Sequence, residues 1–186
     1  MNYLAHLYLS QSNTDLMVGN YIADHVKGRD YLTYPEGIQK GIKMHREIDT
    51  FTDTHAIPQR GKDRLYNKYG KYSAVLIDMF YDHVLAREWS DYSPIALSTF
   101  SRSAYKVLKA QQHLFPPASS RTLDWMSRGD WLSGYATVEG IGRALSGISQ
   151  RARFDNNMDT SVDALIEFYP EYKAEFAEFL PLMIKH

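Results

Sequence analysis

Histidine and aspartate side chains that could bind a metal ion recur at helical spacing in the first half of the chain. The run HREIDTFTDTH, residues 45–55, places His45 and Asp49 four residues apart. One face of a helix would therefore present an imidazole and a carboxylate together. Imidazole nitrogen with carboxylate oxygen suits Mn²⁺, Fe²⁺ or Zn²⁺. The spacing predicts a metal-binding face, and the alternative is a His–Asp hydrogen bond on a helix surface.

The same run offers groups that could act on a bound phosphate. Arg46 projects about 100° around the helix from His45, and its planar guanidinium suits a bidentate contact with phosphate oxygens. Asp53 follows Asp49 by four residues, and His55 ends the run. We predict that Arg46 neutralises phosphate charge, and that Asp53 or His55 orients the attacking water or protonates the leaving group.

Further ionisable groups lie inside apolar segments, where a charged side chain is costly unless it is paired or bound to metal. Asp78 and Asp82 share a face of the segment DMFYDHVLA, Asp24 lies in GNYIADHVKG, and His6 lies in the apolar opening segment. Each alone is compatible with a hydrogen-bonded core residue. Together they indicate one site built from facing helices. The predicted metal ligands are His6, Asp24, His45, Asp49 and Asp82.

The elements that position these residues are predicted to be helices. Apolar residues recur at helical spacing, and no convincing pair of alternating strands is present. The expected helices cover the opening segment, a stretch from Asn13 or Thr14 to Gly28, one from Pro35 through Ile48, and then 56–69, 72–89, 94–113, 119–131, 137–150, 161–168 and 170–185. The predicted fold is an all-α, single-domain helical bundle over residues 1–186.

The composition and the absence of several motifs exclude some classes of protein and of catalytic site. The 186 residues are 44% hydrophobic and 23% charged, with a net charge of −1, which gives no bulk argument for nucleic acid. No apolar run approaches the roughly 20 residues of a membrane helix, and the N-terminal segment is a poor signal peptide, so we expect a cytoplasmic protein. There is no cysteine, G-x-S-x-G elbow, P-loop or dinucleotide fingerprint. Metal-activated water remains as the route to hydrolysis.

Positive charge is concentrated between residues 60 and 71, where five basic side chains accompany Asp63 alone. A solvated helix face with internal pairing is the simpler interpretation. The alternative is a surface that docks an acidic partner. The docking candidates are Arg60, Lys62, Arg64, Lys68 and Lys71.

The motifs MNYLAHLYLS, GNYIADHVKG, GIKMHREIDTFTDTH and DMFYDHVLA, taken together, closely resemble the acyl carrier protein phosphodiesterase family. That family is similar to the all-helical HD-type metal-dependent phosphohydrolases. The resemblance implies hydrolysis of the phosphodiester between 4′-phosphopantetheine and a serine of holo-acyl carrier protein. It also implies Mn²⁺ as the metal, with Mg²⁺ or Fe²⁺ as alternatives, and a small acidic carrier protein as partner.

One departure from the HD pattern limits what can be carried over. No His is followed directly by Asp in this chain, which has Asp24-His25 and Asp82-His83 in the reverse order. The ligand set above therefore rests on the residues themselves. Two other functions stay open: a phosphohydrolase acting on a nucleotide or other small phosphoester, and a non-enzymatic scaffold that binds a partner through some of its 14 tyrosines.

Overall fold

Helices make up most of the described part of the chain, which is residues 1–154 and 156–186 of a computed structural model. No strand occurs in these residues, so the predicted all-α class is confirmed. The α-helices are α1 (Tyr3–Leu9), α2 (Thr14–Ile22), α3 (Glu36–Thr54), α4 (Ala56–Tyr69), α5 (Ser73–Arg87), α6 (Leu97–Ala110), α7 (Pro117–Gly129), α8 (Trp131–Gly134), α9 (Val138–Arg151), α10 (Val162–Glu167) and α11 (Tyr169–Lys185). Short 3₁₀ helices lie between them, at Ala23–His25 (η1), Asp30–Thr33 (η2), Gly70–Tyr72 (η3), Trp89–Asp91 (η4), Gln112–Leu114 (η5) and Met158–Thr160 (η6).

Local sequence signals set several helix ends. Asn13 caps α2 by accepting a hydrogen bond from the Leu16 backbone N–H at 3.0 Å, and Thr137 caps α9 in the same way. Two predicted helices are interrupted. The second ends at Ile22 and continues as the 3₁₀ turn η1. The predicted 119–131 helix gives way to α8 because Asp130 adopts a left-handed conformation with φ of 41°.

Helices α2 and α3 pack with their backbones in contact, and this close approach depends on two glycines. A Cβ at Gly19 would lie 2.2 Å from the Ile38 carbonyl oxygen, and a Cβ at Gly41 would lie 2.5 Å from the Leu16 carbonyl oxygen. Side chains larger than hydrogen are therefore excluded at this crossing. The contact brings the end of α2 beside the middle of α3, where the candidate ligands lie.

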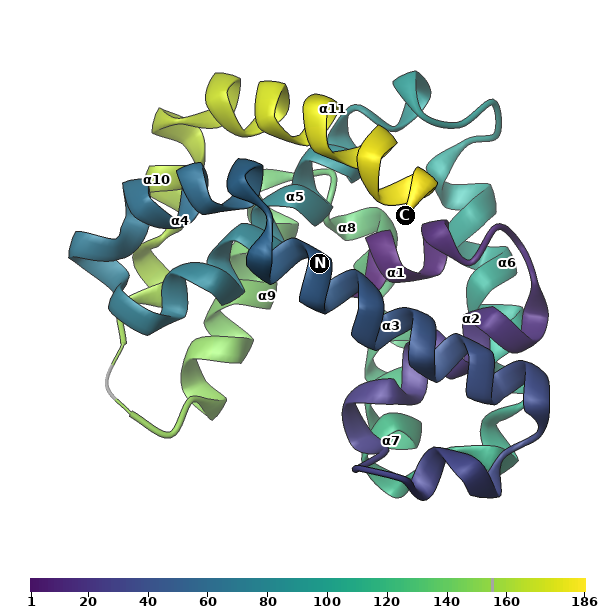
Figure 1. Ribbon diagram of the computed structural model, residues 1–186. Coiled ribbons are helices and arrows are strands. Elements are labelled where there is room, and N and C mark those ends of the chain that lie inside the picture. Colours follow the sequence, from purple (N-terminus) through teal and green to yellow (C-terminus); the bar gives the residue numbers. More distant parts are fainter. Residues whose placement is uncertain (155) are drawn as a thin grey trace.

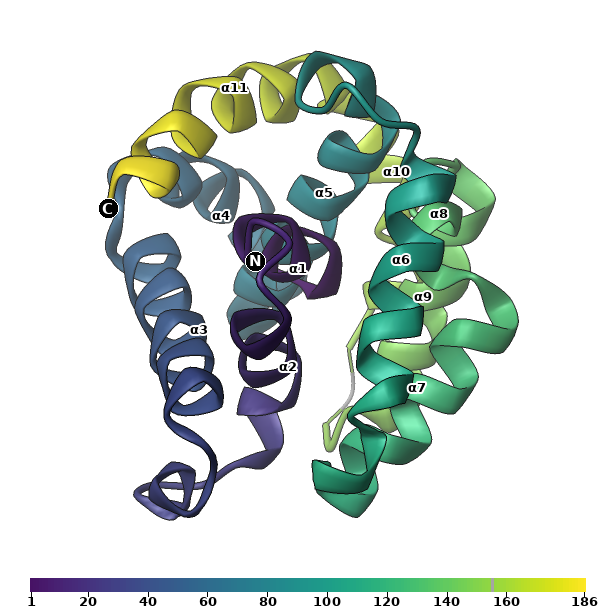
Figure 2. The same cartoon turned by 90° about the vertical axis from the view of Figure 1, so that its right-hand side faces the viewer.

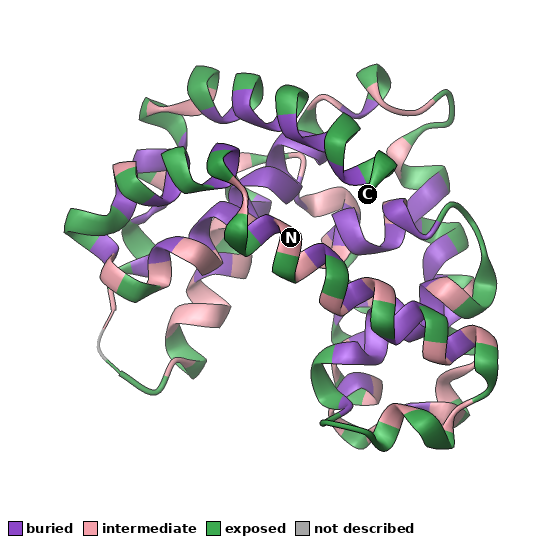
Figure 3. Cartoon of the chain, viewed as in Figure 1, coloured by how far each residue is buried: buried purple, intermediate pink, exposed green. Residues whose placement is uncertain are grey.

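Helix α3 lies at the outer edge of the molecule, and the other helices lie on its inner side (Figure 2). α5 runs through the centre, and its residues Leu76, Ile77, Phe80 and Tyr81 have no exposed surface. Figure 2 shows α1–α4 on one side of the molecule and α6–α9 on the other, and α11 lies across one end in both views (Figure 1). Buried residues line the inward faces and exposed residues the outward faces (Figure 3).

No helix in the described ranges has the length and apolar character needed to cross a membrane. The cytoplasmic location stays a prediction.

Candidate metal centre

Three of the predicted ligands meet where α1 lies beside α3. His6 Nε2 is 3.1 Å from one oxygen of Asp49, and His45 Nε2 is 3.1 Å from the other. The two imidazole rings are stacked, with centroids 4.0 Å apart. One ligand atom from each of these three side chains lies within 4.8 Å of the others, which makes the group a possible site for a divalent metal ion.

Asn20 of α2 fixes both imidazoles from the side opposite Asp49. His6 Nδ1 donates to the Asn20 side-chain oxygen at 2.7 Å, and His45 Nδ1 donates to the Asn20 backbone oxygen at 2.9 Å. A carbonyl oxygen can only accept, so each Nδ1 carries the proton and each Nε2 is left facing Asp49. The Asn20 amide is itself oriented, because its nitrogen donates to the His6 carbonyl at 2.8 Å and to Ser10 at 3.2 Å. Such partners commonly orient metal-bound histidines.

Asp24, in η1, contacts the same group through His45. Its carboxylate lies 3.1 Å from His45 Nε2, and its side chain is 58% exposed. Four of the five predicted ligands are therefore brought together: His6, Asp24, His45 and Asp49. Two imidazole nitrogens with carboxylate oxygens form a mixed donor set that fits a first-row divalent cation.

The electrostatics of the group also favour a cation. Burial opposes the charged form of His45, but hydrogen bonds to Asp24 and Asp49 outweigh it and raise the His45 pKa to about 9. Burial lowers the pKa of His6 to about 4, so this ring is neutral. Burial would raise the Asp49 pKa, yet the hydrogen bond from His45 and the nearby N-terminal ammonium hold it well below its usual range. At neutral pH Asp24 and Asp49 face the His45 imidazolium, and the N-terminal ammonium lies 3.9 Å from Asp49 and 2.6 Å from Asp78. A metal ion would replace the proton on His45.

Asp82, the fifth predicted ligand, is not brought into this group. It is fully buried on α5, and its oxygens accept backbone N–H bonds from Asn2 at 3.2 Å, Leu4 at 2.7 Å and Ala5 at 3.2 Å. These N–H groups belong to the first turn of α1, where no helical partner exists. The burial that suggested a ligand is explained by this role, and Asp82 supports His6 by holding α1.

Arg46, which we predicted to contact phosphate, points away from the group. Its guanidinium donates to the Gly28 carbonyl at 3.0 Å and the Val26 carbonyl at 2.9 Å, and it lies over the Tyr31 ring. These contacts hold the loop after η1 against α3. The turn of about 100° that separates it from His45 directs Arg46 to a different face of the helix.

Asp53 and His55 are also placed elsewhere. Asp53 pairs with Lys62 at 2.9 Å near the end of α3. His55 caps α4, where its Nδ1 accepts the Ile57 backbone N–H at 3.2 Å. Neither residue lines the pocket described below, so the structure does not bring the predicted water-orienting groups to the cluster.

The basic segment 60–71 is largely neutralised within the molecule. Arg60 pairs with Glu178 at 2.9 Å, and Arg64 pairs with the buried Glu175 at 2.6 Å. Lys62 is buried and already paired with Asp53. The cause is the packing of α4 against α11, which supplies the acidic partners. Three of the five predicted docking residues therefore hold helices together.

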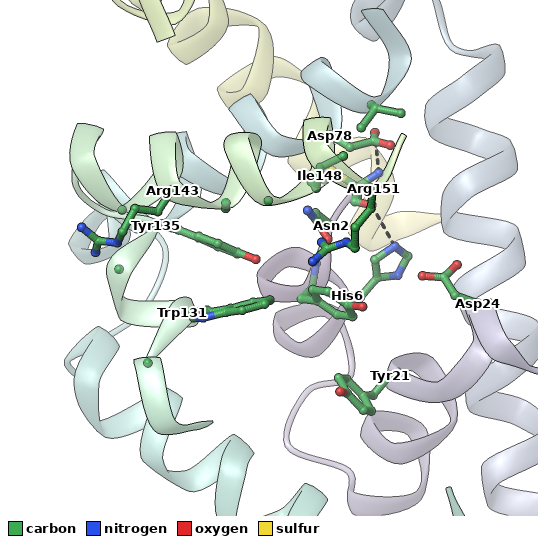
Figure 4. A pocket seen from close by; sticks show the side chains of 18 of the residues that line it. Asn2, His6, Tyr21, Asp24, Asp78, Trp131, Tyr135, Arg143, Ile148 and Arg151 are labelled. Carbon is green, nitrogen blue, oxygen red and sulfur yellow. Dashed lines mark hydrogen bonds and ion pairs between the residues drawn. The ribbon is translucent and has the colours of Figure 1, made fainter. Parts of the chain in front are cut away.

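A pocket of about 500 Å³ opens beside the cluster. Figure 4 shows His6, Asn2 and Asp24 on one wall, with residues of α8 and α9 opposite. The opposite wall includes three polar residues that the sequence analysis did not single out: Tyr135, Arg143 and Arg151. Burial raises the pKa of the Tyr135 hydroxyl well above its usual value, so this group stays protonated.

Comparison with known proteins agrees with the motifs. The family model described as acyl carrier protein phosphodiesterase matches residues 1–183. Proteins named acyl carrier protein phosphodiesterase are similar over the full length of this chain. One from Yersinia pestis is 32% identical and one from Klebsiella pneumoniae (strain 342) is 31% identical, and each match covers 100% of this chain and 96% of the relative. One from Photorhabdus laumondii is 28% identical, and the match covers 100% of this chain and 94% of the relative.

No solved structure matches the chain, so the likeness to HD-type enzymes stays a prediction. The family match, in contrast, spans almost every residue and includes all four motifs that indicated it. The chain belongs to the acyl carrier protein phosphodiesterase family.

Proposed function

We propose that this protein hydrolyses the phosphodiester that joins 4′-phosphopantetheine to a serine of holo-acyl carrier protein, and that it uses a divalent metal ion to do so. The products would be apo-acyl carrier protein and 4′-phosphopantetheine. Family membership supports the substrate. The observation that carries the metal dependence is the convergence of His6 Nε2, His45 Nε2 and the Asp49 carboxylate beside a pocket.

His6, His45 and Asp49 would hold the ion, with Asp24 completing the set or facing the reacting water. Of the metals that the family resemblance implies, Mn²⁺ and Fe²⁺ fit two imidazoles better than Mg²⁺, which prefers an all-oxygen site. When bound, such an ion lowers the pKa of a coordinated water and neutralises charge on phosphate oxygens. Asn20 would keep both imidazoles in the ligating tautomer throughout.

Asp24 is suited to receive the proton of the attacking water. Its hydrogen bond with His45 lowers the Asp24 pKa, so its carboxylate is ionised at neutral pH, and its side chain is exposed toward the pocket. As the new bond between water oxygen and phosphorus forms, the bond from phosphorus to the serine oxygen breaks. That oxygen takes up a proton from solvent, and Asp24 releases its proton to solvent. Arg151, rather than Arg46, would neutralise phosphate charge, because Arg151 lines the pocket.

The direct test is intact-mass spectrometry of holo-acyl carrier protein incubated with untagged protein, with Mn²⁺ or with chelator. We expect conversion to the apo form with metal and none with chelator. Asp91→Asn is a suitable control variant, because Asp91 is an exposed carboxylate outside the pocket lining, whereas Asp49→Asn should be inactive. Unconverted carrier in the presence of bound metal would contradict the proposal and favour a small phosphoester as substrate.

A further inference from the structure

The pocket wall opposite the cluster of His6, His45 and Asp49 is one face of α9. Its residues follow helical spacing, with Gly140, Arg143, Ala144, Gly147, Ile148 and Arg151 all lining the pocket. Two glycines leave real space there. A Cβ at Gly147 would meet only the flexible Arg151 guanidinium, at 3.8 Å, and a Cβ at Gly134 of α8 would meet nothing within 4 Å. The wall is therefore hollowed where larger side chains could have filled it.

The hydroxyl of a buried tyrosine faces this space. Tyr135 is only 2% exposed, and its ring points from the α8–α9 side toward Asn2 (Figure 4). The hydroxyl forms no hydrogen bond with the described residues, and its oxygen is not one of the fully buried atoms left without a partner, so it is open to a ligand in the pocket. His83 fixes the residue, because the fully buried His83 ring donates from Nδ1 to the Tyr135 carbonyl at 2.7 Å.

Two arginines mark the two ends of the wall. Arg151 lies beside Asn2 and His6, near the cluster, and Arg143 lies at the far end (Figure 4). Eight residues separate them, which corresponds to about 12 Å along the helix axis. Neither forms an ion pair within residues 1–154 and 156–186, in contrast to Arg60 and Arg64. Positive charge without an acidic partner at the cluster end is suited to a phosphate group.

We propose that this wall, defined by Gly134, Tyr135 and the pocket face of α9, binds the pantetheine arm of the substrate in an extended form. The proposal rests on the proposed function and assigns the residues that select its substrate. The phosphate lies between Arg151 and the cluster, and the arm runs along Gly147 and Ala144 toward Gly140. The Tyr135 hydroxyl donates to an amide oxygen of the arm. From Gly140 to Arg151 the face is about 17 Å long, which suits a linear chain that carries amide groups.

The test compares metal-loaded wild type with Gly147→Leu, Gly134→Leu and Tyr135→Phe. Leucine at 147 or 134 fills the hollow without touching the cluster, and Gln150→Leu is the matched control, because Gln150 is an exposed residue of α9 outside the pocket lining. Metal content and thermal unfolding are measured for each variant. We expect both leucine variants to retain metal and to lose about 50-fold or more in kcat/KM for holo-acyl carrier protein.

Inhibition separates binding of the arm from other effects. Free 4′-phosphopantetheine should inhibit the wild type at lower concentration than inorganic phosphate does, and the leucine variants should lose this difference. Tyr135→Phe should raise KM about tenfold, as expected for one lost hydrogen bond, with its metal content unchanged.

Two results would count against the inference in different ways. Leucine variants that convert the carrier as fast as Gln150→Leu does, with unchanged inhibition by 4′-phosphopantetheine, would overturn the binding wall and leave the proposed function intact. A metal-loaded wild type that leaves holo-acyl carrier protein unconverted would overturn the proposed function and the wall with it.

Discussion

The two walls of the pocket differ in how tightly their side chains are held. On the cluster wall, His6, His45 and Asp49 are bonded to one another, and Asn20 holds both rings from behind. On the α9 wall, small residues leave space, and Arg151 has no ion-pair partner among the described residues. The contrast indicates that the first wall is preorganised for chemistry, whereas the second is open to a substrate.

The glycines of the two walls show the same division. Gly19 and Gly41 are required because helix backbones touch there, and each contact supports the placement of Asn20 and His45. Gly134 and Gly147 meet no backbone, so the protein itself does not require them. Substitutions on the two walls should therefore fail in different ways.

The largest effect is expected on the cluster wall. Asp49→Asn removes the carboxylate that bridges the two histidines, so we expect loss of bound metal and a fall in turnover of about 10³-fold or more. Metal analysis of the purified protein and initial rates on holo-acyl carrier protein measure both. Retention of metal and activity by this variant would remove the cluster as the catalytic centre.

The glycine comparison should appear in stability. Gly19→Ala would place a methyl group 2.2 Å from the Ile38 carbonyl, so we expect a loss of about 3 kcal/mol in the free energy of unfolding. Gly134→Ala should change it by less than about 0.5 kcal/mol. Urea titration of the metal-free proteins gives both values. Equal losses at the two positions would contradict the division drawn between the walls.

Protonation of the cluster should make the stability of the metal-free protein depend on pH. The His45 pKa is raised to about 9, so its stabilisation is complete below its unfolded pKa of about 6.5 and is lost as the pH rises through 9. The His6 pKa is lowered to about 4, so stability also falls as the pH drops below 6.5. We expect the alkaline loss assigned to His45 to reach about 3 kcal/mol by pH 9 or above.

Urea titrations across this range test the assignment. The His45→Gln variant should lose the alkaline decline, and saturating Mn²⁺ should flatten it in the wild type, because the ion replaces the proton. An unchanged decline in His45→Gln would assign it to another group.

The smallest effect is expected on the basic segment. Of the predicted docking residues, only Lys68 and Lys71 lie outside ion pairs in the described residues, over aromatic rings. Exchange of both for glutamate should raise KM for the acidic carrier by about threefold at low salt, and this change should vanish at high salt. Arg60→Glu should instead lower stability, because it breaks the pair with Glu178. A KM that is insensitive to salt in the wild type would exclude docking by this surface.

The sequence predicts the cluster wall better than it predicts the α9 wall. The structure brings His6, Asp24, His45 and Asp49 together as the sequence predicts, because ionisable residues inside apolar segments leave a clear signal. Asp82 gave that signal too, but its partners are backbone N–H groups, which no side-chain pattern reveals.

The sequence also does not reveal which way Arg46 points or where small residues leave space for a ligand. Arg46 lies next to His45 in sequence, yet which face of α3 turns toward α1 depends on packing against η1 and α2. The sequence around Tyr135, Gly147 and Arg151 is typical of an ordinary surface helix with its preceding turn. A binding wall formed by small residues leaves no local sequence pattern. Most of the helices were predicted, since their periodicity and caps are local.

A crystal structure of the protein with Mn²⁺ and 4′-phosphopantetheine tests the account most directly. The account predicts an anomalous peak between His6 Nε2, His45 Nε2 and Asp49, with the phosphate beside Arg151 and the arm lying along α9 against Tyr135. A metal bound elsewhere, or an arm that leaves the α9 wall empty, would contradict it.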